Sequence, residues 1–365
     1  MPAICPLRDV NIGQIAASQQ QQSFWGINQI LQQKRDHLQY TPVPSSTGSG
    51  PSGYASSPLT DGSQVLSYSS GTNSKGTKKT DPFAGIINQA PPAQTTPLYG
   101  TWVQGLGDWE RDKALNAGDL GHYNNTYTVQ GGIDRTFLGV LSADDAFVIG
   151  LVGSETSSHV DYFNTPTALR LVGPGVGVYS EYVKGGFSGD LTAKFDFLQL
   201  TEDFEGVTPN VGINVLNSGL SGNVQYKFSA AGNSFFEPTM GFTLTHTSFG
   251  SGAVALALED AYTVRLQAGG RVGTTWDLGR GITVDGNVKL VAYGNAIAQG
   301  TAASGPIGGV ILPIAPTDAG LILGEVDPEL CFNLPNDYSL TLSGQARFGN
   351  ALAGGSAGVN LRKQW

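Results

Sequence analysis

The sequence has no run of about 18 apolar residues, so it lacks the segment that a membrane-spanning helix requires. Its most apolar stretch, ASGPIGGVILPIAPT at 303–317, contains glycines and prolines that predict a loop. Cysteine is also scarce, because Cys5 and Cys331 are the two in the chain and lie far apart in sequence. A helical membrane protein and a small disulfide-stapled domain are both excluded.

Charge is sparse and mainly acidic. Charged residues make up 13% of the 365 residues, and the formal net charge is −9. Residues 1–98 carry six Lys or Arg and four Asp or Glu, so the rest of the chain carries a net −11. Nucleic-acid binding proteins present basic surfaces, so nucleic acid is not expected as a partner.

Motifs for enzyme chemistry are missing as well: the sequence contains no G-x-S-x-G, H-E-x-x-H or C-x-x-C. Its four histidines are scattered: His37, His122, His159 and His246. His122 and His159 are expected in external loops beside Asp119 and Asp161, which permits a catalytic dyad without arguing for one. We predict no catalytic, cofactor-binding or metal-ligating residues and no enzymatic activity.

The sequence does contain strict alternation of apolar and polar residues. The stretch YTVRLQAGGRVGTTW runs from Tyr262 to Trp276 and places apolar residues at every second position between these two aromatics. The intervening positions are polar and include Arg265, Gln267 and Arg271. Side chains alternate across the faces of a β-strand, so a period of two predicts a strand with one apolar and one polar face.

The length of this strand favours a membrane over a soluble sandwich. Strands of soluble domains usually have five or six residues. Fourteen steps of roughly 3.3 Å span about 46 Å, which a tilt near 45° projects onto about 33 Å. That span suits a strand that faces lipid, with an aromatic residue at each membrane interface.

The same pattern recurs through the C-terminal part, for example in FSGDLTAKFDF, GITVDGNVKLVAY and YSLTLSGQARF. Charges in the middle of a strand, always on one face, require a polar interior. The residues predicted to face this lumen are Arg265, Gln267, Arg271, Asp285, Lys289 and Arg347. The predicted interface aromatics are Tyr262, Trp276, Tyr338 and Phe348. Two segments, YGTWVQGLGDW and FVIGLVGS, alternate only weakly because both of their faces are partly apolar.

These patterns predict an all-β protein: an antiparallel, twelve-stranded transmembrane β-barrel. The expected strands are 99–110, 126–138, 145–156, 170–184, 187–200, 220–229, 234–248, 261–277, 281–296, 319–333, 338–348 and 352–365. Their connections alternate between long and short, as in outer-membrane barrels with long external loops and short periplasmic turns. Two connections depart from this rule: LGVLSADD, the second, is intermediate in length, and GNAL, the last, is shorter than expected. Long loops are expected outside, near residues 115, 162, 208, 254 and 308.

The chain divides into three parts: 1–40, 41–97 and 98–365. Residues 41–97 are rich in Ser, Gly and Pro and predict a disordered linker. Upstream of it, residues 13–39 are glutamine-rich with apolar residues at helix spacing, and they predict a short helix. Lys34, Arg35 and His37 fall in its last turn, where cations suit the helix dipole. The helix has two interpretations. It is either a surface or coiled-coil segment that remains from a passenger, or a helix inside the barrel.

Several stretches of the barrel part resemble the translocator (β) domain of Gram-negative autotransporters, the family of type V secretion. They are GGIDRTFLGVLSADDAFVIGLVGS, FFEPTMGFTLTHTSFG, the long segment from Tyr262 to GNVKLVAYGN, and the C-terminal YSLTLSGQARFGNALAGGSAGVNLRKQW. The resemblance implies a twelve-stranded barrel with a helix through its pore, which anchors and exports a passenger to the cell surface. The C-terminal strand is similar to the one by which the barrel-assembly machinery recognises its clients, with Val359, Leu361 and Trp365 on one face and Lys363 as a departure.

The resemblance also implies a location in the outer membrane of a Gram-negative bacterium. The expected partners are outer-membrane lipid, the barrel-assembly machinery and the chain's own passenger, and the expected oligomeric state is a monomer. Two features depart from the family. The N-terminus lacks a secretory signal, which suggests a fragment or a late start. About sixty residues separate the predicted helix from Tyr99, and DPFAGIINQAPPAQ (81–94) is a poor substitute, so occupancy of the pore by a helix is in doubt. The alternative function is a narrow outer-membrane channel or a structural surface protein.

Overall fold

The computed structural model describes residues 12–39, 98–113, 121–163, 167–204, 212–230, 233–250, 260–299, 322–350 and 352–365. The predicted linker, residues 81–94 and the loop positions expected near 115, 208, 254 and 308 lie outside these ranges, whereas Tyr162, expected in a loop, is the last residue of a strand. Among the described residues, no helix is both long enough and apolar enough to cross a membrane.

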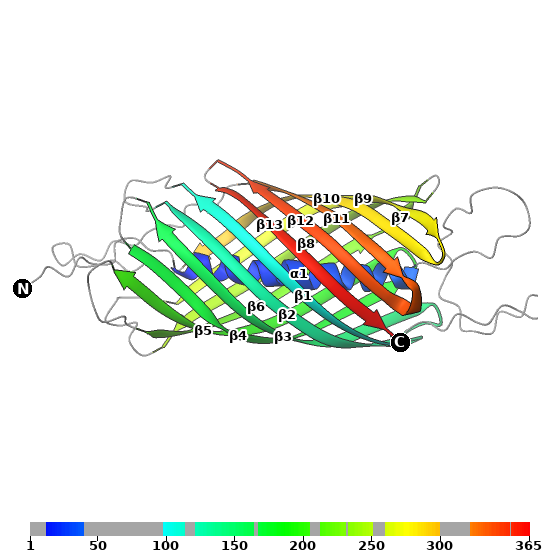
Figure 1. Cartoon of the computed structure of the whole chain (residues 1–365), viewed down its shortest axis with the longest axis horizontal. Coiled ribbons are helices and arrows are strands. Elements are labelled where there is room, and N and C mark those ends of the chain that lie inside the picture. Colours follow the sequence, from blue (N-terminus) through cyan, green and yellow to red (C-terminus); the bar gives the residue numbers. More distant parts are fainter. Residues whose placement is uncertain are drawn as a thin grey trace, which may run out of the picture.

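The strands form one closed antiparallel barrel (Figure 1). They are β1 (Tyr99–Asp112), β2 (His122–Leu138), β3 (Asp145–Tyr162), β4 (Thr167–Lys184), β5 (Phe187–Phe204), β6 (Ile213–Tyr226), β7 (Phe228–Ser229), β8 (Ser234–Phe249), β9 (Ala261–Gly279), β10 (Ile282–Gln299), β11 (Leu323–Leu334), β12 (Tyr338–Phe348) and β13 (Leu352–Gln364). Of these thirteen segments, β6 and the two-residue β7 both pair with β8 and count as one strand of the wall, which gives twelve. The predicted fold class is confirmed.

The barrel closes where its first and last strands meet. β1 and β13 pair from Gly100↔Gln364 to Asp112↔Leu352, and the Tyr99 amide donates to the Trp365 carbonyl at 2.9 Å. Every strand therefore has two neighbours, and the barrel has no open edge, as lipid requires.

Short turns gather at the end of the barrel where β1 begins and β13 ends. They include Gly185–Gly186, Arg280–Gly281 and the single-turn helix η2 (Pro335–Asp337). Positive φ angles at Gly185, Arg280 and Asn336 (55°, 57° and 62°) allow the chain to reverse within two or three residues. The turn between β2 and β3 is longer but ordered, because the Asp145 carboxylate accepts hydrogen bonds from successive backbone amides, at 2.7 Å from that of Val140.

The helix α1 (Ile12–Gln39) lies inside the barrel (Figure 1). Ile12 packs among residues at the long-loop ends of the strands, such as Tyr162. Leu38 packs at the opposite end, and the Gln39 side chain donates to the carbonyl of Gly185 in the turn between β4 and β5 (2.9 Å). The helix therefore occupies the pore, contrary to the doubt raised by the sequence distance between the helix and Tyr99.

Side chains alternate across the wall as a strand requires. On β9, Leu266 is 53% exposed on the outside, whereas Arg265 and Arg271 are buried inside. The two weakly alternating segments lie in β1 and β3. Their inward apolar residues Trp102 and Val152 pack against the helix, so the lumen is not polar all round.

Several strands are longer than predicted at their outer ends, whereas β11 begins at Leu323 rather than near 319. β2 begins at His122 rather than near 126, and β3 continues to Tyr162 rather than ending near 156. Beyond the apolar band the outward residues of these strands become polar, whereas inward residues such as Val160 and Tyr162 are apolar and pack near α1, so the pattern that marks the lipid-facing part no longer holds. His122 and His159 therefore lie in strands and not in loops.

Candidate functional site

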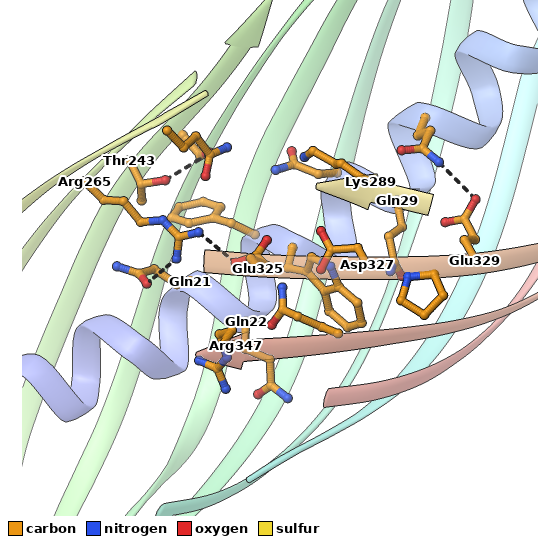
Figure 2. A pocket seen from close by; sticks show the side chains of 18 of the residues that line it. Gln21, Gln22, Gln29, Thr243, Arg265, Lys289, Glu325, Asp327, Glu329 and Arg347 are labelled. Carbon is orange, nitrogen blue, oxygen red and sulfur yellow. Dashed lines mark hydrogen bonds and ion pairs between the residues drawn. The ribbon is translucent and has the colours of Figure 1, made fainter. Parts of the chain in front are cut away.

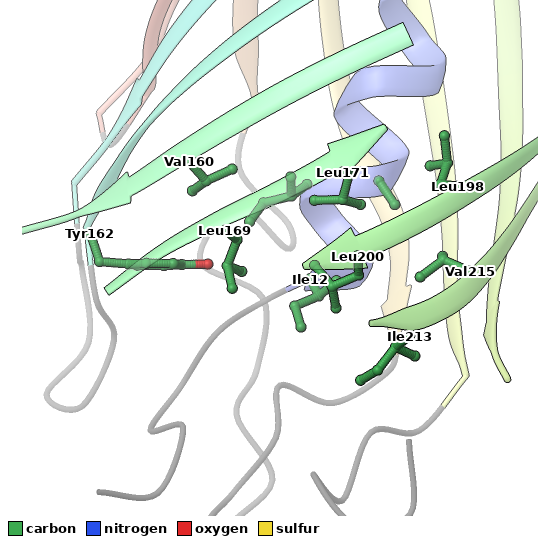
Figure 3. Close-up of a cluster of buried hydrophobic side chains, with 11 residues drawn as sticks. Ile12, Val160, Tyr162, Leu169, Leu171, Leu198, Leu200, Ile213 and Val215 are labelled. Carbon is green, nitrogen blue, oxygen red and sulfur yellow. The ribbon is translucent and has the colours of Figure 1, made fainter. Parts of the chain in front are cut away.

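The functional feature of the molecule is the contact between α1 and the inside of the barrel. The helix packs against the wall through three apolar clusters. The first joins Ile12, Ile15 and Ala16 to β3–β6 (Figure 3), the second joins Ile27, Ile30 and Leu31 to β1, β3 and β4, and the third contains Leu38. All three lie on the β1–β6 side, so the apolar face of the helix is turned towards these strands.

One glycine lets the helix approach the wall closely. A Cβ at Gly26 would lie 2.7 Å from Leu106 of β1, and closer still to the side chains of Gln104 and Gln130. A larger residue here would displace the helix from β1 and β2.

The glutamines of α1 satisfy polar groups of the wall. The Gln20 amide donates to the Asp196 carboxylate at 3.2 Å and to the Lys194 and Asn217 carbonyls at 3.3 Å each. Gln29 accepts from Gln104 at 3.0 Å, and many of the other glutamines make similar contacts. A long neutral side chain that both donates and accepts suits a polar wall, because buried polar groups need partners. This function explains why the helix is rich in glutamine.

Charges concentrate near the C-terminal end of the helix. The members of this charge network are Arg35 and Asp36 of α1 with Glu181, Lys227, Glu237 and Arg271 of the barrel. Arg35 pairs with Glu181 at 3.0 Å and with Glu237 at 3.1 Å. Asp36 accepts from Arg271 at 2.7 Å and from Lys227 at 2.8 Å. Three cations therefore balance three carboxylates, which compensates for much of the cost of burying them.

A second ion pair lies beside this network. Lys34 is 3.7 Å from Asp134, which also accepts from Arg362 at 2.6 Å. The prediction that Lys34 and Arg35 serve the helix dipole is therefore incomplete, because both side chains bind carboxylates of the wall.

On the side away from β1–β6, a small polar cavity separates the helix from the wall (Figure 2). Its helix side is formed by Gln21, Trp25, Asn28 and Gln32, and its volume is about 60 Å³. One water needs about 10–15 Å³ of such space, so the cavity holds a few waters and leaves no room for a second polypeptide segment.

All six residues predicted for the lumen point inward. Arg265 donates to Gln21 (3.1 Å) and Glu325 (2.9 Å), and Gln267 donates to Asn223 (2.8 Å). Lys289 lines the cavity. The remaining partners are Asp36 and Glu237 for Arg271, Thr275 and Asn333 for Asp285, and Asp108 and Glu110 for Arg347.

Sequence analysis missed the barrel partners of the helix, above all Glu181 and Glu237. Each is an isolated carboxylate on the inward face of its strand, and that was the available signal. The pairing itself depends on how far the helix enters the lumen, which no sequence pattern gives.

The four predicted interface aromatics point outward and lie near strand ends. Tyr262 and Trp276 are each 49% exposed, and Tyr338 and Phe348 are exposed likewise. Val359, Leu361 and Trp365 of the C-terminal strand region also face outward. Lys363 shares their face, but its ammonium reaches the Asn336 carbonyl and lies over the Tyr338 ring, 4.5 Å from the centroid.

His122 is buried at the start of β2, with its ring 5.7 Å from that of Tyr162, and the other two histidines of the described strands lie beside carboxylates on the outside of the wall. His159 is 3.2 Å from Asp161, but both side chains are about half exposed on the outside of β3. His246 is 3.5 Å from Asp260 and stacks on Tyr262, also near the outer end of the wall.

A closed barrel with an apolar outside, a polar inside and a helix through the lumen defines the class of outer-membrane barrels with a plugged pore. The family model of the autotransporter β-domain matches residues 101–305, more than half of the chain. The chain belongs to the autotransporter β-domain family. It is an outer-membrane β-barrel translocator of a Gram-negative bacterium, and it serves the export of a passenger in type V secretion.

Solved structures share the fold. The β-domain of the Bordetella autotransporter BrkA aligns with a TM-score of 0.58 at 14% identity, over 73% of this chain and 100% of that one. The transport unit of AIDA-I from Escherichia coli aligns at 0.56 and 13% identity, over 78% and 95%. The translocator domain of NalP from Neisseria meningitidis aligns at 0.53 and 8% identity, over 75% and 90%. Comparison with curated proteins gave no significant match.

Proposed function

We propose that α1 is the last segment of the exported polypeptide and that it stays in the lumen as a plug. The observation that carries this proposal is the direction of the helix. Ile12 lies at the long-loop end of the barrel and Gln39 at the short-turn end. With long loops outside, as in outer-membrane barrels, polypeptide on the N-terminal side of Ile12 emerges at the cell surface.

The charge network holds this plug in place. Arg35 and Asp36 each bind two barrel side chains, so withdrawal of the helix would break ion pairs that are largely removed from solvent. The apolar clusters and glutamine contacts along the rest of the helix add to its retention.

The plug also argues against a general diffusion channel. Beside the helix the described lumen leaves a cavity of about 60 Å³, which is enough for a few waters. An open channel would require the helix to leave the barrel.

Three further parts of the proposal concern partners and chemistry. The outward face of Val359, Leu361 and Trp365 serves as the signal for the barrel-assembly machinery before the barrel has closed. One closed barrel functions as a monomer, because every strand of its wall already has two neighbours. The barrel itself carries out transport and no catalysis.

The test is the location of an epitope tag. A tag inserted directly before Ile12 should bind antibody on intact cells, whereas a tag between Arg280 and Gly281 should bind only after the outer membrane is permeabilised. Protection of the first tag, with the barrel folded, would contradict the proposed direction of export.

A further inference from the structure

The outer surface of the barrel has a hollow where β13, β1 and β2 lie side by side. We call it the apolar groove; its volume is about 480 Å³ and its lining is mostly apolar. Its floor contains Gly105 and Gly107 of β1 and Ala357 of β13, and its walls include Tyr127 of β2 and Val359 of β13. The groove exists because adjoining outward positions carry almost no side chain.

Packing of the barrel does not require these glycines. A Cβ at Gly105 would meet nothing within 4 Å, and one at Gly107 would meet only the Tyr127 ring, at 3.8 Å. Glycine weakens a strand and in a strand interior often marks close approach by a ligand or another backbone. Larger residues would fit here and would favour the strand, so the space points to something outside the chain.

The groove opens onto the lipid-facing surface. Val103 and Trp109, the outward residues that flank the two glycines on β1, are 51% and 53% exposed. Hydrocarbon is the medium that surrounds this surface, and an unfilled hollow would forfeit dispersion contacts. An acyl chain is therefore the group that fits the groove.

Two charged groups border the groove, one beyond its outer end and one at its β3 side. Arg111 follows Gly107 by four residues towards the long-loop end, about 13 Å along the strand. Its guanidinium lies over the rings of Tyr123 and Phe163, 5.6 and 5.7 Å from their centroids. Glu155 of β3 lines the groove and is the one acidic side chain among its lining residues.

We propose that the apolar groove binds one acyl chain of an outer-leaflet glycolipid, an acylated sugar phosphate. Its phosphate binds Arg111, and a hydroxyl or amide N–H of its head region donates to Glu155. A cation beyond the outer end of the groove and a carboxylate at its β3 side suit a lipid that carries both an anionic group and, deeper in its head region, hydrogen-bond donors. The site goes beyond the transport function, because it lies on the outside of the barrel and not in the lumen.

The experiment measures lipid that stays bound to the full-length protein. The protein is reconstituted into bilayers of lipopolysaccharide and phosphatidylethanolamine, extracted in mild detergent and weighed by native mass spectrometry. The test variant is Gly105→Leu, which fills the groove. The matched control is Gly153→Leu, since a Cβ at Gly153 also meets nothing within 4 Å and Gly153 does not line the groove.

We expect Gly105→Leu to lower retained lipopolysaccharide severalfold, and Gly153→Leu to retain as much as wild type. Arg111→Gln should weaken retention of the phosphorylated lipid but not of its dephosphorylated form. Equal retention by wild type and Gly105→Leu would overturn the proposal, and so would equal losses in the two leucine variants. Retention of phosphatidylethanolamine instead would overturn the assignment of the lipid class. Heat-resistant migration in gels shows that each variant has folded.

Discussion

The charge network makes a quantitative prediction about the plug. Arg35 is almost fully buried and binds Glu181 and Glu237, whereas Glu237 also binds Arg271. Arg35→Met would therefore leave Glu181 without its cation while the helix is in place. Removal of one partner from a buried ion pair costs roughly 3–5 kcal/mol, and the partial exposure of Asp36 and Lys227 in the same network favours the lower figure. About 3 kcal/mol corresponds to a roughly 150-fold shift in the equilibrium between plugged and open barrels.

The assay is single-channel recording in planar bilayers with the full-length protein. Wild type should remain closed for nearly all of the record, and Arg35→Met should open far more often. Arg170→Met is the matched control, because Arg170 is exposed on the outside of β4, the strand that also carries Glu181. Adding Glu181→Gln to Arg35→Met removes the uncompensated carboxylate and should restore much of the closed state. Unchanged opening in Arg35→Met, or equal opening in Arg170→Met, would refute the role of the network.

Three more predictions address topology, facing and assembly. In a chain whose Cys5 and Cys331 are replaced by serine, a cysteine in place of Asp318, in an expected external loop outside the described residues, should react with an impermeant maleimide on intact cells. A cysteine in place of Asn336 should not react, and the reverse pattern would mean an inverted barrel. Leu266→Arg should lower the stability of the folded barrel by roughly 2–4 kcal/mol, because residue 266 faces lipid. Gln267→Arg should lower it much less, because residue 267 faces the lumen. Equal losses of heat-resistant barrel in the two variants would contradict this assignment of the two faces. Deletion of Trp365 should reduce the yield of inserted barrel in cells more than it reduces the yield of refolding into detergent. An equal fall in both yields would mean that Trp365 contributes to stability alone.

Alternation of side chains was enough to predict the barrel, because lipid outside and polar groups inside impose the same period on every strand. Tyr262 to Trp276 shows this most clearly: each inward or outward position follows from the residue type. The outer ends of β2 and β3 could not be found in this way. Beyond the lipid, the outward residues of these strands are polar, whereas inward residues such as Val160 and Tyr162 are apolar because they pack near α1, so the alternation of the lipid-facing part is reversed there.

The helix shows a different limit. Its existence followed from spacing and composition, but its place in the lumen did not. Gln20, Arg35 and Asp36 find partners on strands more than a hundred residues away. Trp102 and Val152 were signals of the plug, because an apolar residue on the inside of a barrel strand needs an apolar partner. In the sequence alone, these two residues only weakened the alternation of apolar and polar residues in their strands.

The position and direction of α1 are tested most directly by disulfide trapping in intact cells, with Cys5 and Cys331 replaced by serine. A Cβ at Gly13 would lie closer to the Cβ of Ala261 than the roughly 3.5–4.5 Å of a disulfide, so the pair Gly13→Cys and Ala261→Cys should cross-link on oxidation once the helix moves outward by about 1–2 Å. Gly13→Cys paired with Ala146→Cys should not, because Ala146 packs with Leu38 at the other end of the barrel. Cross-linking of the second pair in place of the first would mean that the helix runs in the opposite direction, and failure of both in a folded barrel would mean that it lies outside the lumen.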